Sequence, residues 1–227
     1  MPIDAVIFDM DGVIVASEDY WWESRVEWTG AHGKTWTPDD QRHCMGRNTV
    51  EWAEVMQERL LLSDVPIPTI MRDVTTLVLN RLDTHLPVLP GAVEAVREAA
   101  THYRVALASG SPTAVIQRVT ALTGLDRVFE VMVFGDDMTR GKPHPDIYLK
   151  AAELLGVEPA HCLGVEDSSN GVRSLHAAGM YALAVPSPGF PLPDDIVQMA
   201  DVNLVSLTEF SVELVEEMAL VPPKAAS

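Results

Sequence analysis

The sequence predicts an α/β fold: a Rossmann-like parallel sheet with helices on both faces, interrupted by an all-helical insert. From about Val105 onward, short apolar runs alternate with helical stretches, which is typical of successive βα units. Between about Ser17 and Leu86, apolar residues recur at helical spacing and no run is typical of a strand. We therefore expect a core domain of residues 1–16 and 87–227 and a helical cap domain of residues 17–86.

The expected elements follow one another in a simple order. The run AVIFD predicts the first buried strand, and the later strands are expected in RVALAS, FEVMVFG, HCLGVED and MYALAVP. Helices between them are expected in PTAVIQRVTALTG, PDIYLKAAELLGV and NGVRSLHAAG. The insert holds four helical runs: EDYWWESRVEW, TPDDQRHC, TVEWAEVMQERLL and TIMRDVTTLVLNRL. After it, LPVLPG marks the return to the core, where AVEAVREAA opens a helix.

Composition excludes several classes of partner. The 227 residues are 47% hydrophobic, which is enough for a full core. With 16 Lys and Arg against 33 Asp and Glu, the net charge of −17 argues against binding nucleic acid or an anionic membrane. The sequence shows no basic leader and no uncharged stretch long enough to span a bilayer. Cys44 and Cys162 lack the spacing of a zinc site or a disulfide framework. We expect buried thiols in a cytoplasmic protein.

The run DMDG places two carboxylates, Asp9 and Asp11, directly after the first predicted strand. Taken alone, the pattern Asp-x-Asp-Gly is at least as consistent with a turn, in which Gly12 supplies a permissive backbone. An EF-hand calcium loop does not fit, because it needs a glycine and a glutamate where this sequence has Ile14 and Tyr20. The motif by itself therefore leaves turn and active site open.

Polar residues also follow three later strands. In LASGSPTAV, Ser109 ends a strand and Gly110 allows close approach of the backbone. There Ser111 and Pro112 are expected as the N-cap and first residue of a helix whose amides suit an anion. In GKPHPDIY, Lys142 lies in the loop after another strand. Each feature is weak alone, since capping serines and solvated lysines are common.

The fourth feature is LGVEDSSNG, where Glu166 and Asp167 end an apolar strand. These acids could cap the following helix or bind Mg²⁺ as hard oxygen ligands. The combination is more specific, because ligands of open α/β sheets bind beyond the carboxyl ends of the strands. Carboxylates concentrated there would repel one another unless a divalent cation lay among them, leaving the lysine and amides for an anion. The sequence therefore predicts a site for phosphoryl transfer.

In these residues the chain resembles the haloacid dehalogenase superfamily, specifically its phosphatases and phosphomutases with a helical cap. DMDGV, ASGS, GKPHPD and GVEDS resemble the four ordered motifs of that superfamily. The resemblance implies a nucleophile, Asp9, and a general acid and base, Asp11. It implies phosphate binding by Ser109, Gly110 and Lys142. It further implies that Mg²⁺ is held by Asp9, the backbone carbonyl of Asp11 and Asp167, with Glu166 in or near that shell.

The function that the resemblance implies is Mg²⁺-dependent hydrolysis of small phosphate monoesters, above all sugar phosphates, through an aspartyl phosphate. The alternative is a mutase similar to β-phosphoglucomutase, since EDSSNG, LPG and LASGS are similar to that enzyme. The mutase, however, has a histidine where Trp21 stands and an arginine where Thr49 stands, whereas Arg47 here directly follows Gly46. VLPG and KPHPDIYL are similar to sugar phosphatases. A binding protein without catalysis is a further alternative, which the complete set of acids disfavours.

All five tryptophans lie in the insert. Most are expected in the core of the cap, and Trp21 and Trp28, one heptad apart, could share a buried helix face. Trp21, Arg25 and Arg47 are the candidate cap contacts to substrate. We expect a monomer or weak homo-oligomer whose partner is a small phosphorylated molecule.

Overall fold

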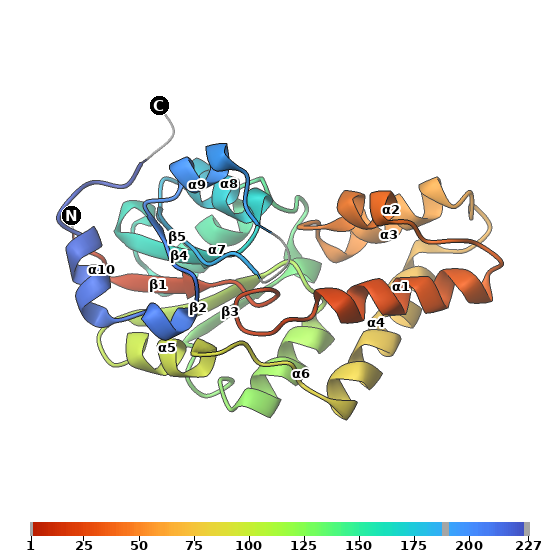
Figure 1. Ribbon diagram of the computed structural model, residues 1–227, viewed down its shortest axis with the longest axis horizontal. Helices are drawn as coiled ribbons and strands as arrows, with labels where there is room; N and C mark the ends of the chain where they lie inside the picture. Colours follow the sequence, from red (N-terminus) through yellow and green to blue (C-terminus); the bar gives the residue numbers. More distant parts are fainter. Residues whose placement is uncertain (1, 188–190, 225–227) are drawn as a thin grey trace.

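The computed structural model describes residues 2–187 and 191–224. Within them, a parallel six-stranded sheet has the strand order β3-β2-β1-β4-β5-β6 (Figure 1). The strands are β1 (Ala5–Phe8), β2 (Arg104–Ser109), β3 (Val131–Phe134), β4 (Cys162–Glu166), β5 (Tyr181–Ala184) and β6 (Val202–Asn203). Ala5 of β1 pairs with Arg104 of β2 on one side and with Cys162 of β4 on the other. The first strand of the chain is therefore central in the sheet.

Helices cover both faces of the sheet, as predicted. Because strand side chains alternate, Val6 and Phe8 of β1 pack in one apolar cluster, while Ala5 and Ile7 pack in another. The first cluster includes α5 (Ala92–Ala99), α6 (Thr113–Thr123) and α10 (Val212–Met218). The second includes α7 (Asp146–Leu155), α8 (Ser169–Ala178) and α9 (Asp194–Met199). Figure 1 shows α5 and α6 below the sheet and α8 and α9 above it. The predicted fold class is confirmed.

The insert, residues 17–86, consists of helices joined by turns and short loops, and these described residues contain no strand. It comprises α1 (Glu18–Ala31), α2 (Pro38–Cys44), α3 (Thr49–Arg59) and α4 (Ile67–Thr84), which extend to one side of the sheet in Figure 1. Side chains fix the start of two helices: Thr37 and Asp40 form a capping box on α2, and Asn48 and Glu51 form one on α3. Four tryptophans of the insert are buried, as expected for a cap core: Trp21, Trp28, Trp36 and Trp52.

The chain enters and leaves the insert at neighbouring points. The backbone N–H of Ala16 donates to the carbonyl of Pro87 across 2.8 Å, and that of Leu89 donates to Ile14 across 2.9 Å. The two connecting segments therefore run side by side between core and insert. The boundaries predicted at residues 16/17 and 86/87 fall beside this crossing, and the division into two domains stays a prediction.

Two local details differ from the sequence-based expectation. Helix α6 begins at Thr113 and its N-cap is Pro112, so the prediction that Ser111 is the N-cap and Pro112 the first helical residue was wrong. The reason is the extended backbone of Pro112, whose ψ of 144° keeps it outside the helix. The segment from α9 through the two-residue strand β6 to α10 was not predicted as elements.

Among the described residues, no helix is both long and apolar enough to cross a membrane.

Candidate active site

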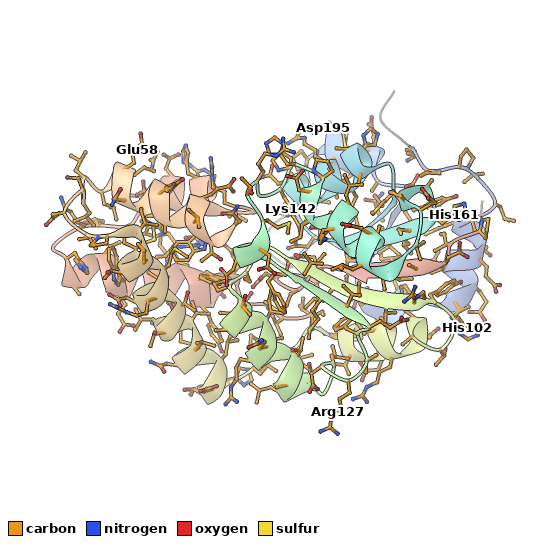
Figure 2. All side chains as sticks on the ribbon, turned by 180° about the vertical axis from the view of Figure 1, so that it is seen from behind. Glu58, His102, Arg127, Lys142, His161 and Asp195 are labelled. Atoms are coloured by element: carbon orange, nitrogen blue, oxygen red, sulfur yellow. The ribbon has the colours of Figure 1, made fainter. Side chains whose placement is uncertain are left out.

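The polar residues predicted at the strand ends come together at one edge of the sheet. Asp9 directly follows β1, Ser109 and Glu166 are the last residues of β2 and β4, and Asp167 comes next. Lys142 reaches this edge from the loop between β3 and α7. Figure 2 shows Lys142 at the junction of the two parts, between the cap, marked by Glu58, and the core helices near Asp195. Parallel strands place their carboxyl ends together, which explains this convergence.

A cavity of about 350 Å³ opens at this edge, between the core and the cap. The core lines it with Asp9, Asp11, Ser109, Gly110, Lys142 and Asp167. The cap lines it with residues that include Trp21, Arg25 and Arg47. The structure therefore brings every predicted site residue except Glu166 to the cavity wall.

Asp9 is buried and is held by a single ion pair. The Nζ of Lys142 donates to Oδ1 of Asp9 across 2.9 Å, whereas Oδ2 accepts no hydrogen bond from residues 2–187 or 191–224. The pKa of Asp9 is raised to about 7, above all by burial and also by the carboxylates of Glu166 and Asp11, which together outweigh the lowering effect of Lys142. One oxygen of Asp9 is thus fixed and the other is available for chemistry.

Lys142 is itself fixed by Glu166 and Tyr148. Its Nζ donates to Oε1 of Glu166 across 2.5 Å and lies 4.9 Å from the centre of the Tyr148 ring. The Tyr148 hydroxyl donates to the same Oε1 across 2.6 Å. Burial lowers the pKa of Lys142, but the carboxylates of Asp9 and Glu166 raise it more, so that it lies above its usual value. The lysine therefore stays a cation within the cavity wall.

Both oxygens of the fully buried Glu166 are occupied. Oε2 accepts from the backbone N–H groups of Asp167 and Ser168, at 3.1 and 3.3 Å, and from the Ser168 hydroxyl at 3.2 Å. Gly171 of α8 makes room for this carboxylate, since a Cβ there would lie 1.8 Å from the Glu166 Cδ. Glu166 therefore orients Lys142 through its Oε1. Its role as a metal ligand stays a prediction.

The acids at this edge fit a metal ion. Asp9, Glu166 and Asp167 each offer a carboxylate oxygen, and these oxygens lie within 4.8 Å of one another. Burial raises the pKa of Asp167, as do the carboxylates of Glu166 and Asp9, while a hydrogen bond from Ser187 lowers it. Lys142 supplies one positive charge to Asp9 and Glu166, and three carboxylates this close leave negative charge for a further cation or a proton. Hard oxygen donors suit a hard cation. The cluster can therefore hold a metal ion.

Gly12 allows Asp167 to approach the first motif. Its φ of 79° lies in the left-handed region, and a Cβ there would lie 1.8 Å from Oδ2 of Asp167. Ser187 links the same two segments, because its hydroxyl lies 2.7 Å from Oδ2 of Asp167 and 3.0 Å from the Gly12 carbonyl. The glycine of DMDG is thus required by the close packing of the site as well as by its turn.

The carboxylate of Asp11 faces four donors. Ser17, which precedes α1, and Trp21 donate to Oδ1, the latter from its indole Nε1 across 3.2 Å. Ser111 and Ser109 donate to Oδ2 across 2.6 and 3.3 Å. Two donors come from the cap and two from the core, so Asp11 lies where the two parts meet.

The two cap arginines differ in setting. Arg25 is buried, donates from Nη1 to Oε1 of Gln41 across 3.1 Å, and lies 5.2 and 5.4 Å from the ring centres of Trp21 and Trp52. Arg47 is exposed and donates from Nε to the His43 carbonyl across 2.6 Å. Arg25 is therefore fixed in the wall, whereas Arg47 is held only at its Nε among residues 2–187 and 191–224.

The cap also contacts the core near Lys142. Oε1 of Glu51 accepts from the backbone N–H of Gly141 across 3.0 Å, and Nδ2 of Asn48 donates to the Met138 carbonyl across 3.0 Å. Nδ2 of Asn170 donates to the Met45 carbonyl across 3.4 Å. These contacts close the cap over the loop that carries the lysine.

Sequence reasoning did not assign a site role to Ser17, Ser111, Tyr148 or Ser187. Ser111 does carry a signal, since a serine before a proline predicts a helix cap, but its hydroxyl donates to Asp11 instead. Tyr148 lies in the first turn of α7 and is spaced like an ordinary core residue. Ser17 and Ser187 meet their partners only through the tertiary fold.

Carboxylates, a buried lysine and hydroxyls at the carboxyl ends of parallel strands define a class, the enzymes that transfer phosphoryl groups. The family of haloacid dehalogenase-like hydrolases matches residues 3–179 of the chain. Hexitol phosphatase B of Escherichia coli K12 is 30% identical over 213 residues, covering 91% of this chain and 94% of that protein. A phosphorylated carbohydrates phosphatase of Thermotoga maritima is 33% identical over 181 residues, covering 78% of this chain and 82% of that protein.

A solved structure shows the same fold. The β-phosphoglucomutase of Clostridium difficile superposes with a TM-score of 0.83 at 22% identity, covering 95% of this chain and 96% of that one. The chain belongs to the haloacid dehalogenase-like hydrolase family. It is a phosphoric monoester hydrolase, as the two phosphatase relatives support. The resemblance found in the four motifs is thereby confirmed.

Proposed function

We propose that the protein is a Mg²⁺-dependent phosphatase of sugar phosphates and related small monoesters, with Asp9 as the nucleophile. The observation that carries this proposal is the setting of Asp9 in the cavity wall, one oxygen held by Lys142 at 2.9 Å and the other without a partner among the described residues. The similarity to a hexitol phosphatase and to a phosphorylated carbohydrates phosphatase supports the substrate class.

In the first half-reaction, Asp9 attacks phosphorus and forms an aspartyl phosphate while the P–O bond to the alcohol breaks. Lys142 holds Asp9 and offsets the charge of the phosphate, and Ser109 and the backbone of Gly110 lie in the same wall to bind its oxygens. Asp9, Asp167 and the backbone carbonyl of Asp11 would hold Mg²⁺, with Glu166 beside them. When bound, Mg²⁺ supplies positive charge that reduces the repulsion between two anions.

In the second half-reaction, water attacks phosphorus and frees Asp9. Asp11 gives its proton to the departing alcohol oxygen in the first step and, now ionised, takes a proton from that water. Its four hydrogen-bond donors hold it beside the nucleophile, and Ser17 and Trp21 make its position depend on the cap. We propose that residues 17–86 act as a cap domain that closes over the substrate and excludes bulk water.

Release of phosphate tests the proposal. Wild-type protein is assayed on p-nitrophenyl phosphate and a panel of sugar phosphates with Mg²⁺ and with EDTA. We expect Mg²⁺-dependent release, its abolition in Asp9→Asn, and a loss of orders of magnitude in Asp11→Asn. Normal release by folded Asp9→Asn would refute the assignment of the nucleophile. Conversion of β-glucose 1-phosphate to glucose 6-phosphate without net release would identify a mutase instead.

A further inference from the structure

The cap contributes a built polar cluster to the cavity, formed by Glu18, Gln41 and Arg25. Nε2 of Gln41 donates to Oε1 of Glu18 across 2.6 Å, and Nη1 of Arg25 donates to Oε1 of Gln41 across 3.1 Å. Glu18 and Arg25 both line the cavity. The amide of Gln41 thus holds a carboxylate and a guanidinium side by side, one from the start of α1 and one two turns further along that helix.

Packing holds this cluster in place. Gln41 and Arg25 are only 7% and 4% exposed, so their positions depend on the contacts they make. Oε1 of Gln41 also accepts from the indole N–H of Trp36 across 2.9 Å, and Arg25 lies against the rings of Trp21 and Trp52. A rigid set of polar groups selects a ligand better than a mobile one, because less entropy is lost on binding.

Glu18 and Arg25 present opposite charges to the cavity, which both residues line. Nε of Arg25 is enclosed by the cap and makes no hydrogen bond with any described residue, so a molecule in the cavity can meet only the other N–H groups of this guanidinium. Beside them, Glu18 provides a carboxylate of which Gln41 holds Oε1. The cluster therefore offers donors and an acceptor to a molecule in the cavity.

The charges of the cap residues that line the cavity favour some ligands over others. The ionisable groups that the cap presents to the cavity include two carboxylates, Glu18 and Asp19, and two guanidinium groups, Arg25 and Arg47, whose formal charges cancel. A second phosphate or a carboxylate on the leaving group would meet the two acids without an excess of positive charge to offset them. Neutral hydroxyl groups can donate to Glu18 and accept from Arg25 at the same time.

We infer that the Glu18–Gln41–Arg25 cluster is a subsite for the hydroxyl groups of a neutral polyol leaving group. The substrate class is then a polyol or sugar monophosphate, rather than a bisphosphate or a phosphorylated acid. This inference rests on the proposed phosphatase function and adds the residues that select the leaving group. Gln41 does not line the cavity and acts as a positioning residue for the other two.

The test compares substrates within each variant. Sorbitol 6-phosphate carries the hydroxyl groups, and p-nitrophenyl phosphate lacks them, so the ratio of their kcat/KM values reports the subsite. In Glu18→Gln and Arg25→Lys we expect this ratio to fall by about tenfold or more, as expected for lost hydrogen bonds to charged groups. Arg42→Lys, at an exposed arginine of α2 paired with Asp39, is the matched control and should keep the wild-type ratio.

Wild-type protein is also assayed on glucose 1,6-bisphosphate and 3-phosphoglycerate, where we expect lower kcat/KM than on sorbitol 6-phosphate. A preference for either anionic substrate would overturn the inference while leaving the phosphatase function intact. Equal loss on both test substrates in folded Glu18→Gln and Arg25→Lys, with an unchanged ratio, would also overturn it. Absence of any Mg²⁺-dependent turnover of p-nitrophenyl phosphate by the wild type would instead defeat the proposed function, and the subsite with it.

Discussion

The indole Nε1 of Trp21 donates a hydrogen bond to Oδ1 of Asp11 across 3.2 Å. This contact joins the first helix of the cap to the acid and base proposed for the reaction. An indole N–H can donate but cannot take up a proton at ordinary pH. Trp21 therefore orients Asp11 without sharing its proton, unlike the histidine that the resemblance places at this position in β-phosphoglucomutase. This difference supports hydrolysis over mutase chemistry.

Removing that donor should slow the reaction while preserving the fold. For Trp21→Phe we expect kcat on p-nitrophenyl phosphate to fall by about tenfold, as expected for one lost hydrogen bond to a charged group. Trp28→Phe is the matched control, because Trp28 is buried on the same helix and its Nε1 has no hydrogen-bond partner among the described residues. Steady-state kinetics and thermal melts measure both variants. Equal losses of kcat in Trp21→Phe and Trp28→Phe would contradict the prediction, because the loss would then come from the packing of the cap and not from the hydrogen bond to Asp11.

A side chain at Gly12 should destroy the metal site. In Gly12→Ala the new Cβ would overlap Oδ2 of Asp167, so we expect Mg²⁺-dependent activity to fall by orders of magnitude. Gly33→Ala is the control, since Gly33 also has positive φ, 67°, but no atom lies within 4 Å of the Cβ position. That variant should cost about 1 kcal/mol in free energy of unfolding and keep its activity. Full activity in Gly12→Ala would contradict the observed packing.

Protonation of Asp9 should make the stability of the metal-free protein depend on pH. Its pKa is raised from 3.8 to about 7, so between these values the folded protein keeps a proton that the unfolded chain loses. The contribution of Asp9 to stability therefore falls as pH rises from about 4 to about 7. In EDTA, we expect the Tm of Asp9→Asn to exceed that of the wild type at about pH 7.5. The difference in Tm should be smaller at about pH 5.5.

The same group should couple Mg²⁺ binding to pH. Protons compete with the metal for Asp9, so added Mg²⁺ should raise the wild-type Tm more at about pH 7.5 than at about pH 5.5. The control is Asp137→Asn, at an exposed position of the short 3-10 helix after β3, and this variant should follow the wild type. An equal rise in Tm on adding Mg²⁺ at both pH values would show that Asp9 is not a ligand of the metal.

Glu51 should control how firmly the cap closes. Its Oε1 accepts from the Gly141 N–H, next to Lys142, so Glu51→Ala should release the loop that carries the lysine. We expect faster amide hydrogen exchange in residues 138–142 and a lower kcat/KM for sugar phosphates. Glu54→Ala, at an exposed position of the same helix, should change neither. Unchanged exchange in Glu51→Ala would show that the contact does not hold the cap.

Much of this site could be predicted because it depends on local patterns and on one rule of topology. Asp9, Ser109 and Glu166 follow apolar runs that form strands, and parallel strands bring such residues to one edge. Contacts that depend on side-chain packing carry no such pattern. Ser111 reaches Asp11 across 100 positions of sequence, and Tyr148 reaches Glu166 only because α7 lies against the sheet.

The pairing of β1 with β2 and β4 also fixes the order in which the molecule can assemble during synthesis. Ala5 is synthesised before Arg104 and Cys162, so the strand is enclosed only after both partner strands have been made. All residues of the helices between 18 and 84 are synthesised before either partner strand. The apolar strand β1 is thus without its partners while the whole insert is being made, and Asp9 can meet Lys142 only after a further 133 positions have been synthesised.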